Sequence, residues 1–102
     1  MINSQEGDTQ LTLKQLTPVR MMKNQFFNEV QQAERRGATE EELKTLLGRA
    51  RAKKGMFEGD LEQGELEIGQ VSASIKDVKP AAQILNEIWN GFLKAKSEIE
   101  KL

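Results

Sequence analysis

The end of this 102-residue sequence carries an apolar stripe that strongly constrains how the chain can fold. From Pro80 onward, apolar residues recur at alternating spacings of four and three, which places them on one face of an α-helix. Proline is favoured at the first helical position, so we predict a helix over about 80–101. The stripe covers only three heptads, and Trp89 flanks it, which favours packing against a core over a coiled-coil seam. That core need not lie within this chain. The stripe consists of Ala81, Leu85, Ile88, Phe92, Ala95, Ile99 and Leu102.

Two further helices are predicted upstream. Helical spacing of apolar residues over about 24–36 ends at Gly37, a residue suited to a left-handed stop. Thr39 followed three residues later by Glu42 forms a capping box, and the apolar face after it runs to about residue 53. These helices, 24–36 and 39–53, are expected to form an αα-hairpin.

The rest of the chain is less regular. Leu11 and Leu13 alternate with polar residues, which suits a short half-exposed strand, although we favour an extended arm that packs on another surface. Thr17-Pro18 is a helix-start signal. Glycines recur among acids from Gly55 to Gly69, which favours tight turns and close backbone approaches, with a short helix near 70–75. We therefore divide one partial domain into an extended arm (1–16), a helical hairpin (17–54), a Gly/acid-rich segment (55–79) and an amphipathic helix (80–102).

Missing residue types exclude several kinds of site. The chain has no Cys and no His, so thiolate nucleophiles, cysteine-held metals and the usual general base are excluded. A net charge of −1 argues against a dedicated nucleic-acid binder. No run of 18 apolar residues and no signal peptide are found, so we expect no membrane partner and a cytoplasmic location. Leu, Ile, Val and Phe together number 25 of 102, enough for a thin core that folds marginally alone.

Charged clusters give only weak indications of function. Arg49, Arg51, Lys53 and Lys54 would surround a helix instead of lining one face, so we expect a solvated helix end rather than an anion site. The acids after Gly55 fit no calcium-loop register, and we predict no metal site. General acid–base catalysis by paired carboxylates in this acidic segment stays an open alternative. The Gly69-Gln70 pair suits close approach of a ligand, but the residues alone favour an ordinary loop.

Three runs of sequence resemble one enzyme family. Residues 6–9 with 16–24 are similar to the segment that follows the barrel in nitronate monooxygenases (2-nitropropane dioxygenases). Residues 49–60 are similar to the next part of that family. Residues 62–72 contain the G-x-x-x-x-G-Q pattern, at Gly64, Gly69 and Gln70, that this family shares with FMN-dependent enoyl-ACP reductases. The resemblance covers about residues 5–93, with the motifs in the family's order.

The resemblance implies a fold and a cofactor for a parent enzyme. It implies a mainly α segment of a flavin-binding (β/α)₈ TIM barrel that lacks the barrel itself. The family's flavin-phosphate strands and His-containing motif are not in this sequence, so the resemblance implies a C-terminal part beginning at Met1. FMN would then be held by the parent, and this chain alone would bind no FMN and catalyse nothing. The parent would oxidise alkyl nitronates with O₂ or, alternatively, reduce enoyl thioesters with NAD(P)H.

Roles for individual residues follow from the same resemblance. The segment from Gly64 to Ser72 would form a roof over the substrate side of the flavin, with Gly69 allowing close approach and Gln70 as an orienting hydrogen-bonding group. Glu67 and Ser72 belong to this roof, and Arg20 and Asn24 would anchor the segment to the barrel. A rival hypothesis is a free-standing helical interaction module. The expected partner is therefore the barrel of the same enzyme, or a second copy bound through the 81–102 stripe.

Overall fold

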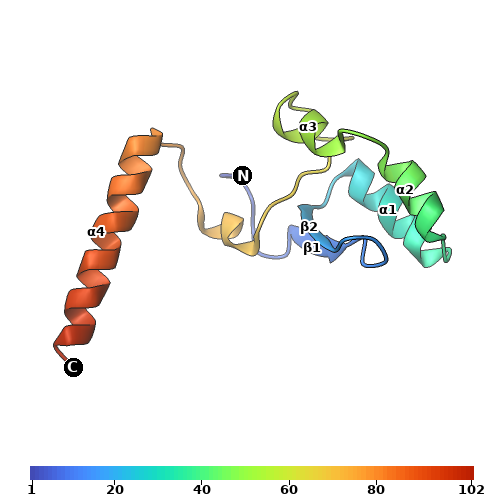
Figure 1. Ribbon diagram of the computed structural model, residues 1–102. Helices are drawn as coiled ribbons and strands as arrows, with labels where there is room; N and C mark the ends of the chain where they lie inside the picture. Colours follow the sequence, from blue (N-terminus) through green and yellow to red (C-terminus); the bar gives the residue numbers. More distant parts are fainter.

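The computed structural model describes all 102 residues, and the chain is mainly helical with one small sheet, as predicted. A packed body holds the sheet and three helices, and α4 stands away from it at the end of an extended connection (Figure 1). The elements in chain order are β1 (Thr9–Thr12), β2 (Val19–Met22), α1 (Gln25–Arg35), α2 (Glu40–Leu47), α3 (Arg51–Met56), the 3₁₀ helix η1 (Gln70–Ser74) and α4 (Ala81–Glu100).

The core lies between the sheet and the first two helices. β1 and β2 pair antiparallel, with Thr9 opposite Met22 and Thr12 opposite Val19. The buried side chains of α1 pack on Met21 of β2, and a second small cluster joins the end of α1 to α2. The main cluster consists of Leu13, Met21, Phe26, Phe27 and Val30, and the second of Ala33, Ala38 and Leu43.

Helix α1 begins where its sequence predicted, but the preceding residues are not helical. The Asn24 side-chain oxygen caps the helix by accepting from the Phe27 amide at 2.9 Å. Residues 19–22, which the expected 17–54 hairpin included, form β2 instead, so the helix-start signal at Pro18 was misleading. The φ angle of proline suits extended backbone as well as helix, and strand pairing decides between them here.

The second predicted helix is interrupted. Its capping box is confirmed, because the Glu42 amide donates to Thr39 Oγ1 at 3.2 Å and the Thr39 amide donates to Glu42 Oε2 at 3.1 Å. The helix ends at Leu47 instead of residue 53, since Gly48 and Ala50 take positive φ angles of 64° and 63°. A separate short helix, α3, follows and includes Gly55, which we had placed in the irregular segment.

The N-terminal arm is partly a strand and packs on η1. Ser4 is buried, and its hydroxyl donates to the Ser72 carbonyl oxygen at 2.8 Å. Along β1 the simple alternation of Leu11 and Leu13 fails: Leu11 is exposed, and Leu13 turns inward just after the strand with a φ of 54°. The Leu13 amide donates to Glu34 of α1 at 2.8 Å. These hydrogen bonds join the arm to η1 at Ser4 and to α1 at Leu13.

Helix α4 has the predicted bounds but no buried residue. Lys79, just before the helix, forms ion pairs with Glu87 of α4 at 2.8 Å and with Asp77 of the preceding connection at 3.3 Å. The whole apolar stripe is exposed, and the rings of Trp89 and Phe92 stack on it with centroids 5.3 Å apart. Neither this helix nor any other in the structure has the length and apolar character needed to cross a membrane. The packing of α4 is therefore incomplete in this chain.

Replacing the capping residue tests the local origin of α2. Thr39→Ala removes the side-chain acceptor for the Glu42 amide and should lower the free energy of unfolding by about 1 kcal/mol. Thr45→Ala is the matched control, because Thr45 is exposed in mid-helix and only bonds back to the Glu41 carbonyl. Urea unfolding followed by circular dichroism measures both. Equal destabilisation by the two substitutions would contradict a role for the cap.

Candidate functional site

Residues 65–68 lie along the second edge of β2, opposite β1. The Met22 amide donates to the Leu66 carbonyl at 2.9 Å, and the Ile68 amide donates to the Arg20 carbonyl at 3.1 Å. Met21 and Glu67 face each other in a short antiparallel bridge. This backbone pairing fixes the start of the segment that the resemblance assigned as a roof.

Two glycines let α3 and the Gly/acid-rich segment touch through their backbones. A Cβ atom added at Gly64 would lie 2.3 Å from the Gly55 Cα and 2.5 Å from the Asp60 carbonyl oxygen. Both glycines are buried. The close backbone approach predicted from the glycine density is therefore confirmed for Gly55 and Gly64.

Of the two predicted anchors, Asn24 holds this segment directly. Its side-chain amide donates to the carbonyls of Leu61 at 3.0 Å and Gly64 at 2.8 Å while its oxygen caps α1. Arg20 instead contacts β1, donating to the Thr9 carbonyl at 3.2 Å. Both side chains make contacts within the chain, and contact with a barrel stays a prediction.

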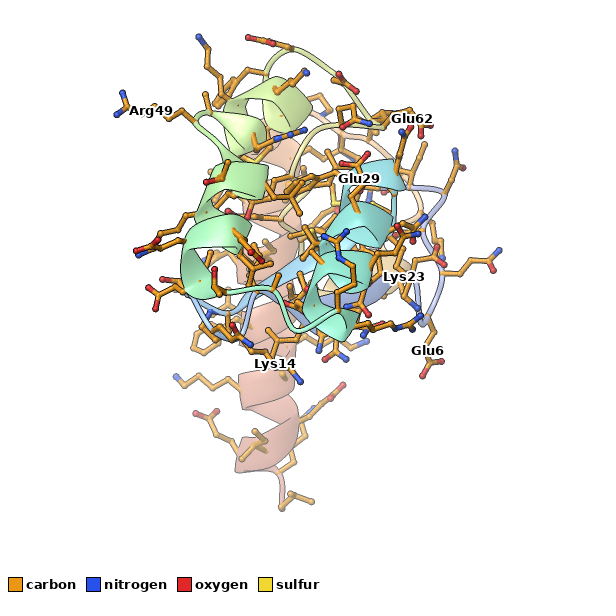
Figure 2. The ribbon with its side chains drawn as sticks, turned by 90° about the vertical axis from the view of Figure 1, so that its right-hand side faces the viewer. Glu6, Lys14, Lys23, Glu29, Arg49 and Glu62 are labelled. Atoms are coloured by element: carbon orange, nitrogen blue, oxygen red, sulfur yellow. The ribbon has the colours of Figure 1, made fainter.

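Arg51 joins several segments of the chain through its side chain, a role that the sequence analysis did not predict. Its guanidinium donates to the Leu46 and Leu47 carbonyls at 3.2 and 3.1 Å, and to the Gln63 carbonyl at 2.9 Å. It also lies 4.6 Å from the centroid of the Phe26 ring. The prediction of a solvated basic cluster is therefore wrong for Arg51. Arg49, by contrast, extends outward from the body, as do other charged side chains (Figure 2).

The proposed roof residues do not gather in one hollow. Gln70 is exposed beside Gln5 and Lys76, and its side-chain amide makes no hydrogen bond within the chain. Ser72 is buried under the N-terminal arm. Glu67 lines a separate hollow against α2. Their common position on the substrate side of a flavin stays a prediction.

Gly69 has an ordinary backbone conformation and lies in open space. Its φ is −79°, which any residue adopts, and no atom lies within 4 Å of a Cβ built on it. The backbone at this position therefore does not require glycine. The open space above Gly69 still permits an external group to approach closely.

Glu65 is a buried carboxyl that sequence analysis did not single out. It is only 7% exposed, and it lies with Glu67 on the strand face turned toward α2. Burial, and then the neighbouring Glu67 carboxylate, raise the pKa of Glu65 above its usual range. The alternation of the two glutamates was the available signal, because residues two apart on a strand share a face. We call the space beside them the Glu65 hollow, lined by Leu13, Leu16, Thr17, Val19, Lys44, Leu47, Glu65 and Glu67.

These groups can bind and orient a partner but supply little chemistry alone. A free amide at Gln70 and carboxyls at Glu65 and Glu67 can form hydrogen bonds. Gly69 and Gln70 are both exposed, and open space surrounds a Cβ built on Gly69. A flavin phosphate needs a cluster of backbone donors like that of a barrel's phosphate site, and these residues form none. A position of these residues over a flavin stays a prediction.

Comparison with known proteins gives a match in structure. No family model matches the chain, and no curated protein matches its sequence. The solved structure of FabK from Thermotoga maritima superposes with a TM-score of 0.81 and 25% identity over 97% of this chain. A point mutant of the same FabK superposes with a TM-score of 0.74 at 22% identity, also over 97% of this chain. The match confirms the family resemblance drawn from the three sequence motifs.

The chain spans only 31% of the length of FabK. The match includes the sheet, the hairpin helices and α4, since almost the whole chain takes part. FabK is a TIM-barrel enzyme, and the mainly helical segment seen here corresponds to about 30% of it. The predicted fold class, a mainly α segment similar to part of a TIM-barrel enzyme, is therefore confirmed.

Substitution of two glycines tests the close backbone contact. Gly64→Ala should destabilise the chain by about 1–3 kcal/mol or more, because the new Cβ would overlap backbone atoms of α3. Gly69→Ala is the matched control and should change stability by no more than about 0.5 kcal/mol, since open space surrounds it. Chemical unfolding measures both, and a tolerated Gly64→Ala would contradict the contact.

Glu65→Gln tests the buried carboxyl through pH. Because folding raises the pKa of Glu65, its contribution to stability is fully present below the unfolded pKa and is lost as the pH rises through the folded pKa. The substitution should therefore stabilise the chain more at about pH 8 than at about pH 4. The exposed Glu58→Gln is the control and should show no such difference. Thermal unfolding across this pH range is the measurement, and a pH-independent effect of Glu65→Gln would count against the assignment.

Proposed function

We propose that this chain forms the helical cover of an FMN-dependent enoyl-ACP reductase and acts together with a flavin-binding barrel. The observation that carries the proposal is the fold match to FabK, an FMN-dependent enoyl-ACP reductase of the nitronate monooxygenase family, over 97% of the chain. The substrate class would be enoyl thioesters and the reductant NAD(P)H. FMN bound to the barrel would supply the hydride-transfer chemistry.

The comparison favours reduction over nitronate oxidation. Sequence motifs alone led us to place nitronate oxidation first and the reductase as the alternative. Both superposed structures are FabK, and this supports the alternative. Nitronate oxidation by O₂ remains the second candidate, on the strength of the motifs in residues 6–24 and 49–60.

Within the proposal, the chain's own residues position the substrate. Pairing with β2 holds residues 65–68, and Arg51 and Asn24 hold the preceding turn through Gln63 and Gly64. These contacts would present the free amide of Gln70 to the substrate side of the flavin. Gly69 would leave room for the ring or the substrate to approach.

The exposed stripe of α4 is consistent with a missing partner surface. A helix whose apolar face is wholly exposed is unusual for a monomeric protein and indicates an interaction surface. We infer that the barrel of the same enzyme covers it. Binding of a second copy of the chain to the stripe, or a free-standing role of the chain as a helical module, would contradict this inference.

Two hybrid enzymes test the proposed reaction. In one, this chain replaces the matching third of Thermotoga maritima FabK, and in the other it replaces the equivalent part of a nitronate monooxygenase. The FabK hybrid should reduce a crotonyl thioester with NADPH, and the other hybrid should regain little nitronate oxidation. Activity of the nitronate hybrid alone would overturn the choice of reductase, and two inactive but folded, FMN-loaded hybrids would overturn the proposal altogether.

Variants of the active hybrid test the residue assignment. Gln70→Ala should lower turnover or substrate affinity by roughly 5- to 150-fold while FMN content stays unchanged, because one orienting hydrogen bond is worth about 1–3 kcal/mol. Lys53→Ala, at an exposed position without an ion pair, is the control and should keep its activity. Unchanged kinetics for Gln70→Ala would remove the roof assignment. The unmodified chain alone should neither shift the absorbance of FMN nor quench its fluorescence.

A further inference from the structure

The Glu65 hollow combines a buried acid with apolar walls. Glu65 is 7% exposed, a degree of burial that carboxyl groups rarely reach without a partner. The walls come from three places in the chain: the end of the arm, β2 and the last turn of α2. Four of the lining side chains are aliphatic: Leu13, Leu16, Val19 and Leu47.

No cation of the chain balances this acid. Besides Glu65, the charged groups that line the hollow are Glu67, which has the same charge, and Lys44 of α2. The Lys44 ammonium is held instead by Glu40, one turn earlier on the helix, at 2.8 Å. Neither glutamate forms an ion pair with Lys44 or with another cation of the chain. Glu65 is buried, and Glu67 is exposed beside it.

We propose that the Glu65 hollow receives an arginine side chain from the polypeptide that covers this face. The aliphatic walls suit the methylene stem of arginine, and the two carboxyls suit the forked donors of its guanidinium. Arginine keeps its charge when buried, so its single positive charge can balance one of the two acids while its forked donors reach both carboxyls. The inference rests on the proposed function only in identifying the covering polypeptide as the barrel.

A small cation tests the hollow without the barrel or the flavin. Titration of the isotope-labelled chain with n-butylguanidinium, followed by NMR, should shift the amides of residues 65–67 and of α2 saturably. The carboxyl titration midpoint of Glu65 should fall in its presence, because the bound cation favours the ionised form. Neutral n-butylurea has nearly the same shape and should bind about 10-fold or more weakly, since a hydrogen bond to a charged group is worth about 1.5–3 kcal/mol.

Two variants complete the test. Glu65→Gln should weaken n-butylguanidinium binding by about 10-fold or more, while Glu62→Gln, an exposed acid of the same segment, should leave it unchanged. Equal binding of the charged and neutral probes, retained binding in Glu65→Gln, or no saturable shift at all would each overturn the proposal. Failure here would leave the hybrid-enzyme result untouched, so the two proposals are tested separately.

Discussion

The backbone pairing of residues 65–68 with β2 is the interaction on which the rest of the body depends. It sets the strand register that turns Glu65 and Glu67 toward α2 and leaves Leu66 and Ile68 on the other face. A slip by one residue would exchange the two faces. The contact of Gly64 with α3 and the hydrogen bonds of Arg51 to the preceding turn are consistent with this single register.

The body that precedes α4 has a packed core, whereas the apolar face of α4 is not packed against any other part of the chain. Side chains from the sheet, α1 and α2 form a small closed core, whereas α4 buries none of its residues. Burial of apolar surface is the main favourable term in folding, so a helix with an uncovered stripe gains little from its present position. This imbalance, together with a match to 31% of FabK, supports the proposal that the chain acts with a barrel.

Local signals in the sequence predicted the helices, and long-range contacts decided the rest. Asn24, Thr39 and Pro80 mark helix starts through interactions within a few residues, and all three starts are confirmed. The strand at Val19–Met22 pairs on one edge with the nearby β1 and on the other with residues 66–68, more than 40 residues away, and no local pattern contains this second pairing. The structural role of Arg51 and the burial of Glu65 likewise arise from packing between distant segments, so their sequence neighbourhood gave a misleading impression of solvent exposure.

Hydrogen exchange along α4 tests most directly whether the chain is built to be covered by a barrel. In the isolated chain, the amides of Ala81–Glu100 should exchange far faster than those of Gln25–Arg35, because only the latter helix is packed. Adding FMN-loaded FabK that lacks its matching third should protect α4 strongly. Strong protection of α4 in the isolated chain that increases with its concentration, or no added protection from the barrel, would contradict the account.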